Sequence, residues 1–257
     1  MARDHLMFTL AAPMASFGAI AVGERRPSWS RPSRSQVLGL IASALGIERR
    51  EEERLAALAT ALHYAVRVDV TGQPHADYHT AQVPPSRRNR RFYPRADELA
   101  VPKPELKTIL SRRDFYTDSM HTIAVWARTE QQLSPSLAEM ANALAEPRYA
   151  PFAGRKAHPL LLPMAPRVVA ADDIVAAYAA FDAGEPEAVK AFRLRHVRDK
   201  DRPAAASIFV DADAVPLSQV ARLEQRRDVP ESRSKWRFGT RAEALLNPVK
   251  PSVGGAA

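Results

Sequence analysis

Serine and arginine side chains gather where an apolar segment near the N-terminus gives way to a predicted helix. Residues 6–46 read LMFTLAAPMASFGAIAVGERRPSWSRPSRSQVLGLIASALG. The first turn of a helix presents backbone N–H groups and the positive end of the helix dipole, so it favours anions. Hydroxyl and guanidinium groups beside it would add hydrogen bonds to a phosphate. The segment therefore predicts either a phosphate-binding cradle without a Walker-type loop or an ordinary capped helix after an ordinary strand.

The residues of this predicted cradle would have different roles in binding a nucleic acid. Gly18 would let a nucleic-acid backbone approach closely, and Phe17 would either stack on a base or pack in the core. Arg34 is expected in the exposed first turn of the helix, where it would contact phosphate. The cradle residues are Ser16, Phe17, Gly18, Arg25, Arg26, Ser33, Arg34 and Ser35.

A second cationic segment lies between residues 85 and 113. It contains nine lysines or arginines, three acidic residues, four prolines and few apolar residues. Such a segment cannot bury a core of its own, so we expect it to project from the domain and to become ordered only when bound. It either contacts RNA, with Tyr93 as a stacking ring, or is a solvated run of charge. The arginines predicted to contact RNA are Arg87, Arg88, Arg90, Arg91, Arg112 and Arg113.

The composition points to a polyanionic partner. The 257 residues include 37 lysines and arginines against 29 aspartates and glutamates, which gives a formal net charge of +8. Nucleic acid is the expected partner, unless the arginines reflect a proteome that is rich in arginine throughout. The absence of cysteine excludes disulfides and cysteine-based zinc sites or nucleophiles. The seven histidines lack ligand spacing, so neither a metal nor another cofactor is expected.

Neither a signal peptide nor a membrane-spanning segment is predicted. The start MARDHLMFTL does not have the pattern of a signal peptide, and no run of 18 apolar residues occurs. A soluble, cytoplasmic protein without a membrane partner is expected.

Hydrophobic periodicity predicts the elements that would position these groups. The first predicted elements are a strand at 6–11, a helix that begins with a Ser33–Gln36 capping box and ends at Gly46, a helix to residue 61 and a strand at 62–70. The basic segment is followed by strands at 115–117 and 120–127, a helix at 134–145 and a strand at 148–152. This is the βαββαβ order of a ferredoxin-like, RRM-like domain. Its sheet would bury one face under two helices and leave the other free to bind RNA.

We therefore predict an α+β protein with a ferredoxin-like domain over residues 1–160. The basic excursion, here called the thumb, is expected at about 78–115. A smaller C-terminal α+β subdomain is predicted over 161–247, with helices at 172–181 and 187–195, a strand at 207–211 and a basic end. Residues 248–257 are rich in proline, glycine and alanine and are expected to form a disordered tail.

Six motifs together resemble the Cas-five family of CRISPR-associated proteins, and its subtype I-E members most of all. In two places the sequence departs from the family pattern: Phe17 stands where tryptophan is usual and Arg34 where lysine is usual, and both keep the chemistry. The motifs are Ser16-Phe17-Gly18, the helix PSRSQVLGLIASALG, Asp77-Tyr78-His79-Thr80, RRDFYTD at 112–118, Gly154-Arg155-Lys156, and RDVPESRSKWRFG at 227–239.

The resemblance implies a RAMP-type ferredoxin-like domain bearing a thumb, in the CRISPR RNA-guided surveillance complex called Cascade. Such a subunit binds the repeat-derived 5′ handle of the guide CRISPR RNA, caps the filament of backbone subunits and docks the large subunit. Pairing between the guide and the target DNA reads the sequence, so the subunit would meet DNA only indirectly. The same motifs add Arg155 and Lys156 to the predicted RNA-binding residues.

Two other functions stay open. Some members of the wider family cut precursor CRISPR RNA, which needs a general base and acid near the scissile phosphate and a cation for its developing charge. Tyr78 and His79, with Lys156 or Arg155, would form such a metal-independent ribonuclease site, although the subtype I-E motifs imply that a separate subunit cuts. The remaining alternative is a generic basic RNA-binding protein outside any surveillance complex.

Overall fold

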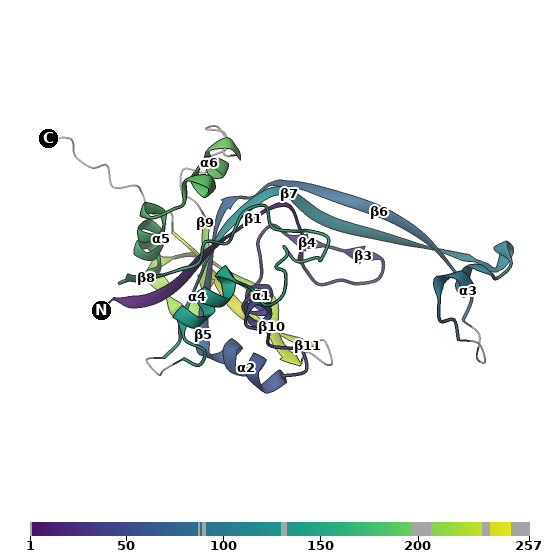
Figure 1. Cartoon of the computed structure of the whole chain (residues 1–257), viewed down its shortest axis with the longest axis horizontal. Helices are drawn as coiled ribbons and strands as arrows, with labels where there is room; N and C mark the ends of the chain where they lie inside the picture. Colours follow the sequence, from purple (N-terminus) through teal and green to yellow (C-terminus); the bar gives the residue numbers. More distant parts are fainter. Residues whose placement is uncertain are drawn as a thin grey trace.

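One large sheet organises the molecule (Figure 1). The computed structural model describes residues 2–86, 88, 91–129, 133–196, 207–232 and 237–247, without the side chains of 192–196. The strands of the sheet are β1 Arg3–Ala15, β3 Arg25–Arg26, β5 Leu62–Val70, β6 Gln73–Val83, β7 Lys107–Ala127, β8 Arg167–Ala171, β9 Ser207–Asp211, β10 Val220–Ser232 and β11 Arg237–Leu246. They run in the order β10-β11-β9-β5-β7-β1-β8, while β3 and β6 pair with β7 beside this path. A separate pair is formed by β2 Phe17–Gly18 and β4 Ser28–Trp29.

β1 and β7 are interior strands of the sheet, and both are buried on both faces. Residues 5–12 of β1 and 119–126 of β7 are buried, and the two strands pair in antiparallel fashion from Leu6↔Val125 to Ala15↔Tyr116. β5 pairs with the other edge of β7, and β8 with the other edge of β1, again antiparallel. Strands buried on both faces carry continuous apolar runs, which is the pattern that the sequence shows here.

Helices cover both faces of the sheet. Leu6 and Phe8 of β1 pack with the first, second and fourth helices, whereas Met7 packs with Tyr178 and Phe181 of the fifth. The expectation that one face stays open for RNA is therefore wrong, because the fifth helix, from the C-terminal part, covers it. The helices are α1 Arg34–Ala44, α2 Glu52–Ala61, α3 Arg95–Leu99, α4 Leu137–Ala145, α5 Ile174–Ala183 and α6 Glu187–His196. None of the helices in the described ranges combines the length and the apolar character needed to span a bilayer.

The strand expected at 148–152 is not formed. Pro147 precedes this segment and Pro151 lies within it, and proline cannot donate a ladder hydrogen bond. Only Phe152 makes an isolated bridge, to Pro159. The place beside β1 is taken by β8 instead.

The C-terminal part continues the same sheet. β9 pairs with β5, β11 with β9, and β10 with β11. The division expected near residue 160 therefore has no counterpart in the sheet, which is continuous across it. The predicted tail at 248–257 lies outside the described residues.

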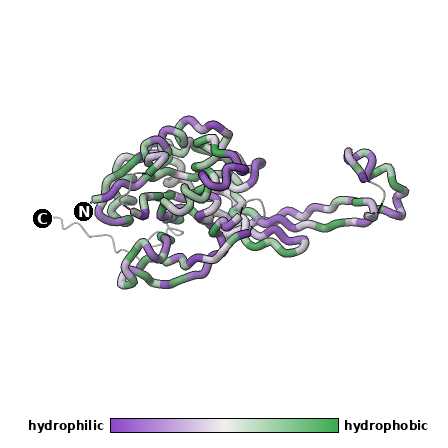
Figure 2. The backbone as a smooth tube through the Cα atoms, turned by 90° about the horizontal axis from the view of Figure 1, so that it is seen from below, coloured by the Kyte–Doolittle hydropathy of each residue, from purple (hydrophilic) through white to green (hydrophobic). Residues whose placement is uncertain are grey.

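The thumb is a long β-hairpin rather than an irregular excursion. β6 and β7 pair from Gln73↔Thr117 to Val83↔Lys107, and α3 lies at the tip. Figures 1 and 2 both show the hairpin extending far beyond the body of the molecule. The prolines that suggested an irregular segment lie in the tip, outside the paired strands, so cross-strand hydrogen bonds give the thumb regular structure without a core. Arg87 and Arg90 lie outside the described residues.

Candidate nucleic-acid interface

The loop after β1 lies against the base of the thumb. β3 pairs in parallel with β7, so that Arg25 lies opposite Arg112 and Arg26 lies opposite Arg113. The N–H of Arg112 also donates to the carbonyl of Glu24 at 3.1 Å. Two groups of arginines that the sequence analysis placed in separate sites are therefore neighbours in one surface.

Asp114 holds arginines from three segments in this surface. Its Oδ2 accepts hydrogen bonds from Nε and Nη2 of Arg25 at 3.1 and 2.9 Å, and its Oδ1 accepts from Nε of Arg112 at 3.1 Å. Its carbonyl oxygen accepts from the Ser16 hydroxyl at 3.1 Å and from Nη2 of Arg155 at 3.2 Å. Partial burial raises the pKa of the Asp114 carboxyl, but the hydrogen bonds from Arg25 and Arg112 outweigh it and bring the pKa below its ordinary value. Asp114 thereby orients cations that solvent still reaches.

The start of α1 has the predicted capping box but is not open to an anion. Ser33 Oγ accepts from the N–H of Gln36 at 3.4 Å, and Oε1 of Gln36 accepts from the N–H of Ser33 at 2.9 Å. The N–H of Arg34 donates to the carboxylate of Asp228 at 2.9 Å. A carboxylate of the protein thus lies where the sequence analysis expected a phosphate.

Arg34 is buried, which corrects the expectation of an exposed first turn. Only 4% of its surface is exposed. Its guanidinium donates to the carbonyls of Leu62, at 2.8 Å, and Ala59, and lies 3.4 Å from the Asp211 carboxylate. Ser33 is buried as well, whereas Ser35 is half-buried. The physical reason is that the C-terminal strands cover this end of the helix. Local sequence patterns do not predict contacts between segments that lie so far apart along the chain.

A buried network of opposite charges joins the start of α1 to the C-terminal strands. Nη2 of Arg31 lies 2.6 Å from Oε2 of Glu243. Arg241 pairs with Asp228 at 2.8 Å and with Asp211 at 3.0 Å. These carboxylates were not among the predicted site residues. Only Asp211 gives a local signal, because it ends the apolar strand SIFVD, where a buried charge must be paired.

One group of metal-type ligands lies in the same network. His63, Asp211 and Asp213 offer ligand atoms within 4.8 Å of one another. Nη2 of Arg128 lies 2.9 Å from Asp211, and its Nη1 contacts Asp213. A guanidinium therefore already balances both carboxylates.

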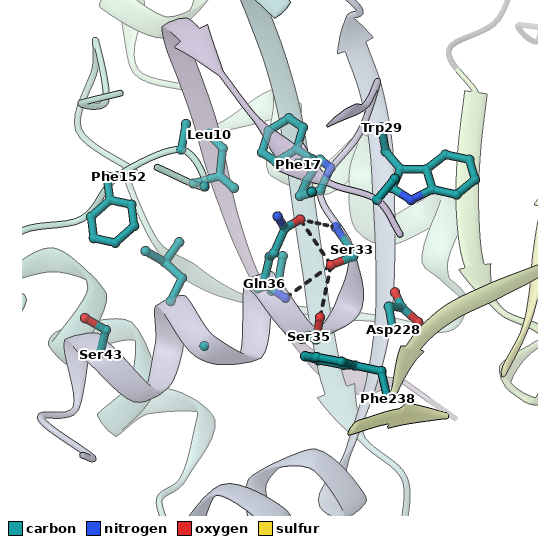
Figure 3. A pocket seen from close by; sticks show the side chains of 18 of the residues that line it. Leu10, Phe17, Trp29, Ser33, Ser35, Gln36, Ser43, Phe152, Asp228 and Phe238 are labelled. Atoms are coloured by element: carbon teal, nitrogen blue, oxygen red, sulfur yellow. Dashed lines mark hydrogen bonds between the residues drawn. The ribbon is translucent and has the colours of Figure 1, made fainter. Parts of the chain in front are cut away.

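A cavity of about 980 Å³ opens between the loop after β1, α1 and residues 150–154 (Figure 3). Phe17 lines it but is only 3% exposed, and its ring meets that of His121 edge-on, so it packs in the core. Trp29 and Phe152 also line the cavity and are 37% and 42% exposed. Neither ring was among the predicted site residues. Phe152 is available for a base to stack on, whereas the Arg226 guanidinium lies over the Trp29 ring at 4.8 Å and leaves only its other face. A Cβ at Gly18 would meet no atom within 4 Å, so open space lies in front of that backbone.

The structure does not bring Tyr78, His79 and Lys156 together. Tyr78 and His79 are adjacent and exposed on β6, so their side chains point to opposite faces of the hairpin. His79 lies 3.8 Å from Asp77. Lys156 lies in the turn after Gly154, and among the described residues no contact joins it to either side chain.

The tip of the thumb carries exposed cations and an exposed ring. Tyr93 is 82% exposed, and the Arg91 guanidinium lies 6.0 Å from its centroid. Arg88 is also exposed, in a turn. Arg95 pairs with Glu98 and donates to the carbonyl of Gln82, so part of the charge in this segment is structural.

Comparison with known proteins identifies the family. The model of the family described as CRISPR-associated protein (Cas_Cas5) matches residues 5–242, and the chain belongs to this family. The CRISPR system Cascade subunit CasD of Escherichia coli (strain K12) is 31% identical over 172 residues, which cover 63% of this chain and 70% of CasD. The resemblance drawn from the sequence motifs is therefore confirmed.

Two solved structures share the fold. A chain of a CRISPR RNA-guided surveillance complex has a TM-score of 0.63 and 26% identity, covering 98% of this chain and 93% of that one. A Cas protein crystal structure has a TM-score of 0.54 and 24% identity, and the match covers 95% of each chain.

Proposed function

We propose that this chain is a non-catalytic, cytoplasmic subunit of a Cascade-type complex that binds the 5′ handle of the guide CRISPR RNA. The observation that carries the proposal is the meeting of arginines from the loop after β1, from β7 and from the Gly154–Lys156 turn at the base of the thumb. Arginines bind phosphates through paired N–H donors. The family membership and the likeness to CasD support the same function.

Four adjacent strands at one end of the sheet support a ferredoxin-like core. The order β8-β1-β7-β5 is antiparallel throughout, α1 and α2 connect β1 to β5, and α4 precedes β8. This order is the one expected of a βαββαβ, ferredoxin-like domain, which supports assigning these strands to such a core. The thumb then extends the pairing of β5 with β7, because β6 continues from β5 along β7, and β9–β11 widen the sheet beyond β5.

The remaining partners follow from this assignment. The thumb tip, with Tyr93 and Leu99 exposed, would contact a backbone subunit of the filament that this chain caps. The large subunit would dock beside the handle, and target DNA would be met only through the guide. Co-purification of one discrete guide RNA would distinguish this function from generic RNA binding.

We expect Arg112→Glu to weaken binding of repeat-sequence RNA by roughly tenfold. The change removes a cation and places a second carboxylate beside Asp114. The slope of log Kd against log salt should also fall by about 0.7 for each phosphate that the variant no longer neutralises. Fluorescence anisotropy over a salt series measures both quantities.

The matched control is Arg50→Glu, which makes the same charge change in the loop before α2, at a side chain that is 82% exposed. Its affinity and salt slope should stay close to those of the unmodified protein. Equal decreases in the two variants would contradict a localised site at the base of the thumb.

We expect the full chain not to cleave repeat-sequence RNA, with or without divalent metal. Tyr78 and His79 point to opposite faces of β6, so they cannot act together on one phosphate. A denaturing gel of end-labelled RNA tests this. A site-specific product that disappears in His79→Ala would favour the ribonuclease function instead.

A further inference from the structure

A second cavity, of about 340 Å³, lies where the thumb base, the loop after β1 and the Gly154–Lys156 turn meet. Its wall includes Ser16, Gly18 and Gln36, and three arginines: Arg26, Arg113 and Arg155. No aspartate or glutamate from the described part of the chain lines it. The cavity is therefore concave and carries three positive charges.

Arg155 is held in place by its turn. The N–H of Ala153 donates to the carbonyl of His158 at 2.8 Å, and the N–H of Ser16 donates to the carbonyl of Ala153 at 3.0 Å. Gly154 has φ +86°, and a Cβ there would lie 1.8 Å from the Ser16 carbonyl oxygen, so only glycine lets the turn approach β1 this closely. With Nη2 of Arg155 also bonded to the Asp114 carbonyl at 3.2 Å, the guanidinium is positioned before any ligand arrives.

The strand pairing at the thumb base divides the arginines into two sets. Arg25 and Arg112 are opposite each other and share the Asp114 carboxylate. Arg26 and Arg113, one residue further on, face the cavity, and neither has an ion pair with a carboxylate within the ranges that the structure describes. Nη1 of Arg26 is bonded to the carbonyl of Gly23 at 2.6 Å, which fixes its direction.

The electrostatics show that these cations repel one another. Burial lowers the pKa of the Arg155 guanidinium, and the positive charge of Arg113 lowers it further. Asp77, which lies opposite Arg113 across the hairpin, acts in the other direction. A bound anion would relieve this repulsion.

We propose that this cavity binds one phosphodiester group of the guide RNA, held by Arg113 and Arg155 with Arg26 at its rim. This inference rests on the proposed function and deepens it, because it assigns one phosphate to one named pair of arginines. Asp114 is a positioning residue here, since it orients Arg155 through its carbonyl oxygen. Gly18, with open space in front of it, allows the sugar-phosphate backbone to pass.

The test is a phosphate scan. A series of repeat-sequence RNAs, each with one neutral methylphosphonate linkage, is titrated against the full chain and against Arg155→Ala and Arg113→Ala. One linkage should weaken binding to the unmodified protein by roughly tenfold or more and have little further effect in either variant. Arg112→Ala, which removes the same charge from the neighbouring position, is the matched control. Its effect should add to the effect of that linkage.

Two further measurements guard against a trivial result. Asp77→Asn should tighten RNA binding two- to threefold, an increase that a misfolded protein would not show, and an unchanged affinity would count against the cavity.

DNA of the same sequence and inorganic phosphate are the competing probes. An equally coupled linkage in DNA would overturn the assignment to RNA, and displacement of RNA by inorganic phosphate without any preferred linkage would reveal a generic anion site.

The outcomes separate this inference from the proposed function. If the unmodified chain does not bind repeat-sequence RNA, the proposed function is wrong. If it binds with ordinary salt dependence but no single linkage is coupled to Arg113 and Arg155, the function stands and this inference is wrong.

Discussion

Replacing Asp211 with alanine is expected to lower the free energy of unfolding by about 3–5 kcal/mol. Asp211 is 2% exposed, and its carboxylate pairs with Arg241 at 3.0 Å, with Arg128 at 2.9 Å and with Arg34 at 3.4 Å. It also accepts the N–H of Tyr64 at 3.1 Å. Removing it leaves the buried Arg34 guanidinium without its carboxylate partner, while Arg241 keeps Asp228. Urea denaturation followed by circular dichroism measures the change.

Asp213→Ala is the matched control for this variant. Asp213 lies two residues away, pairs with Arg128 and has a side chain that is 61% exposed. An exposed ion pair contributes little, so this variant should be destabilised by less than about 1 kcal/mol. Similar destabilisation of the two variants would show that the network at Asp211 is not what ties α1 to the C-terminal strands.

Shortening the thumb is expected to abolish assembly while the body stays folded. Val83 and Lys107 form the last pair of the hairpin, so replacing residues 84–106 with Asn-Gly would close it with a type I′ turn. Among the described residues, none from the removed segment belongs to the hydrophobic clusters of the body. We therefore expect a stability change of less than about 0.5 kcal/mol.

Pull-down on a tagged backbone subunit, with both bands quantified, measures the effect on assembly. This chain and the large subunit should disappear together, because the thumb would fix one end of the filament and the large subunit would dock beside it. A variant that keeps the hairpin length but lacks the Arg95–Glu98 ion pair is the control and should assemble. Retention of both subunits by the shortened protein would show that the thumb tip is a solvated extension.

The central elements could be predicted from the sequence because their signals are local. β1 and β7 carry apolar runs long enough to be buried on both faces, and α1 and α4 begin with capping boxes at Ser33 and Ser136 that the structure contains. β8 could not be predicted, since it is only five residues long and every second residue inside it is exposed. β10 and β11 are strongly charged, and they become strands only because each pairs with a neighbour.

The candidate site can be predicted in residue type but not in arrangement. Arg25 and Arg112 are evident as cations, yet their meeting depends on β3, a strand of two residues that no periodicity reveals. The burial of Arg34 cannot be foreseen because the carboxylates around it belong to β9 and β10, far along the chain. Asp114 is one of two aspartates in the motif RRDFYTD, and nothing in the sequence marks it as the one that orients Arg25, Arg112 and Arg155.

β7 extends for 21 residues from the thumb into the body of the sheet, with one break in its extended conformation at Asp118, whose φ is +54°. Because side chains alternate along a strand, a residue inserted in the thumb would turn the following side chains to the opposite face unless a bulge absorbed it. Adding or removing matched pairs on both strands, in steps of two residues or about 7 Å, changes the reach of this arm without changing which side chains face the core. We therefore expect homologues that span different distances to their neighbours to differ in thumb length by an even number of residues on each strand.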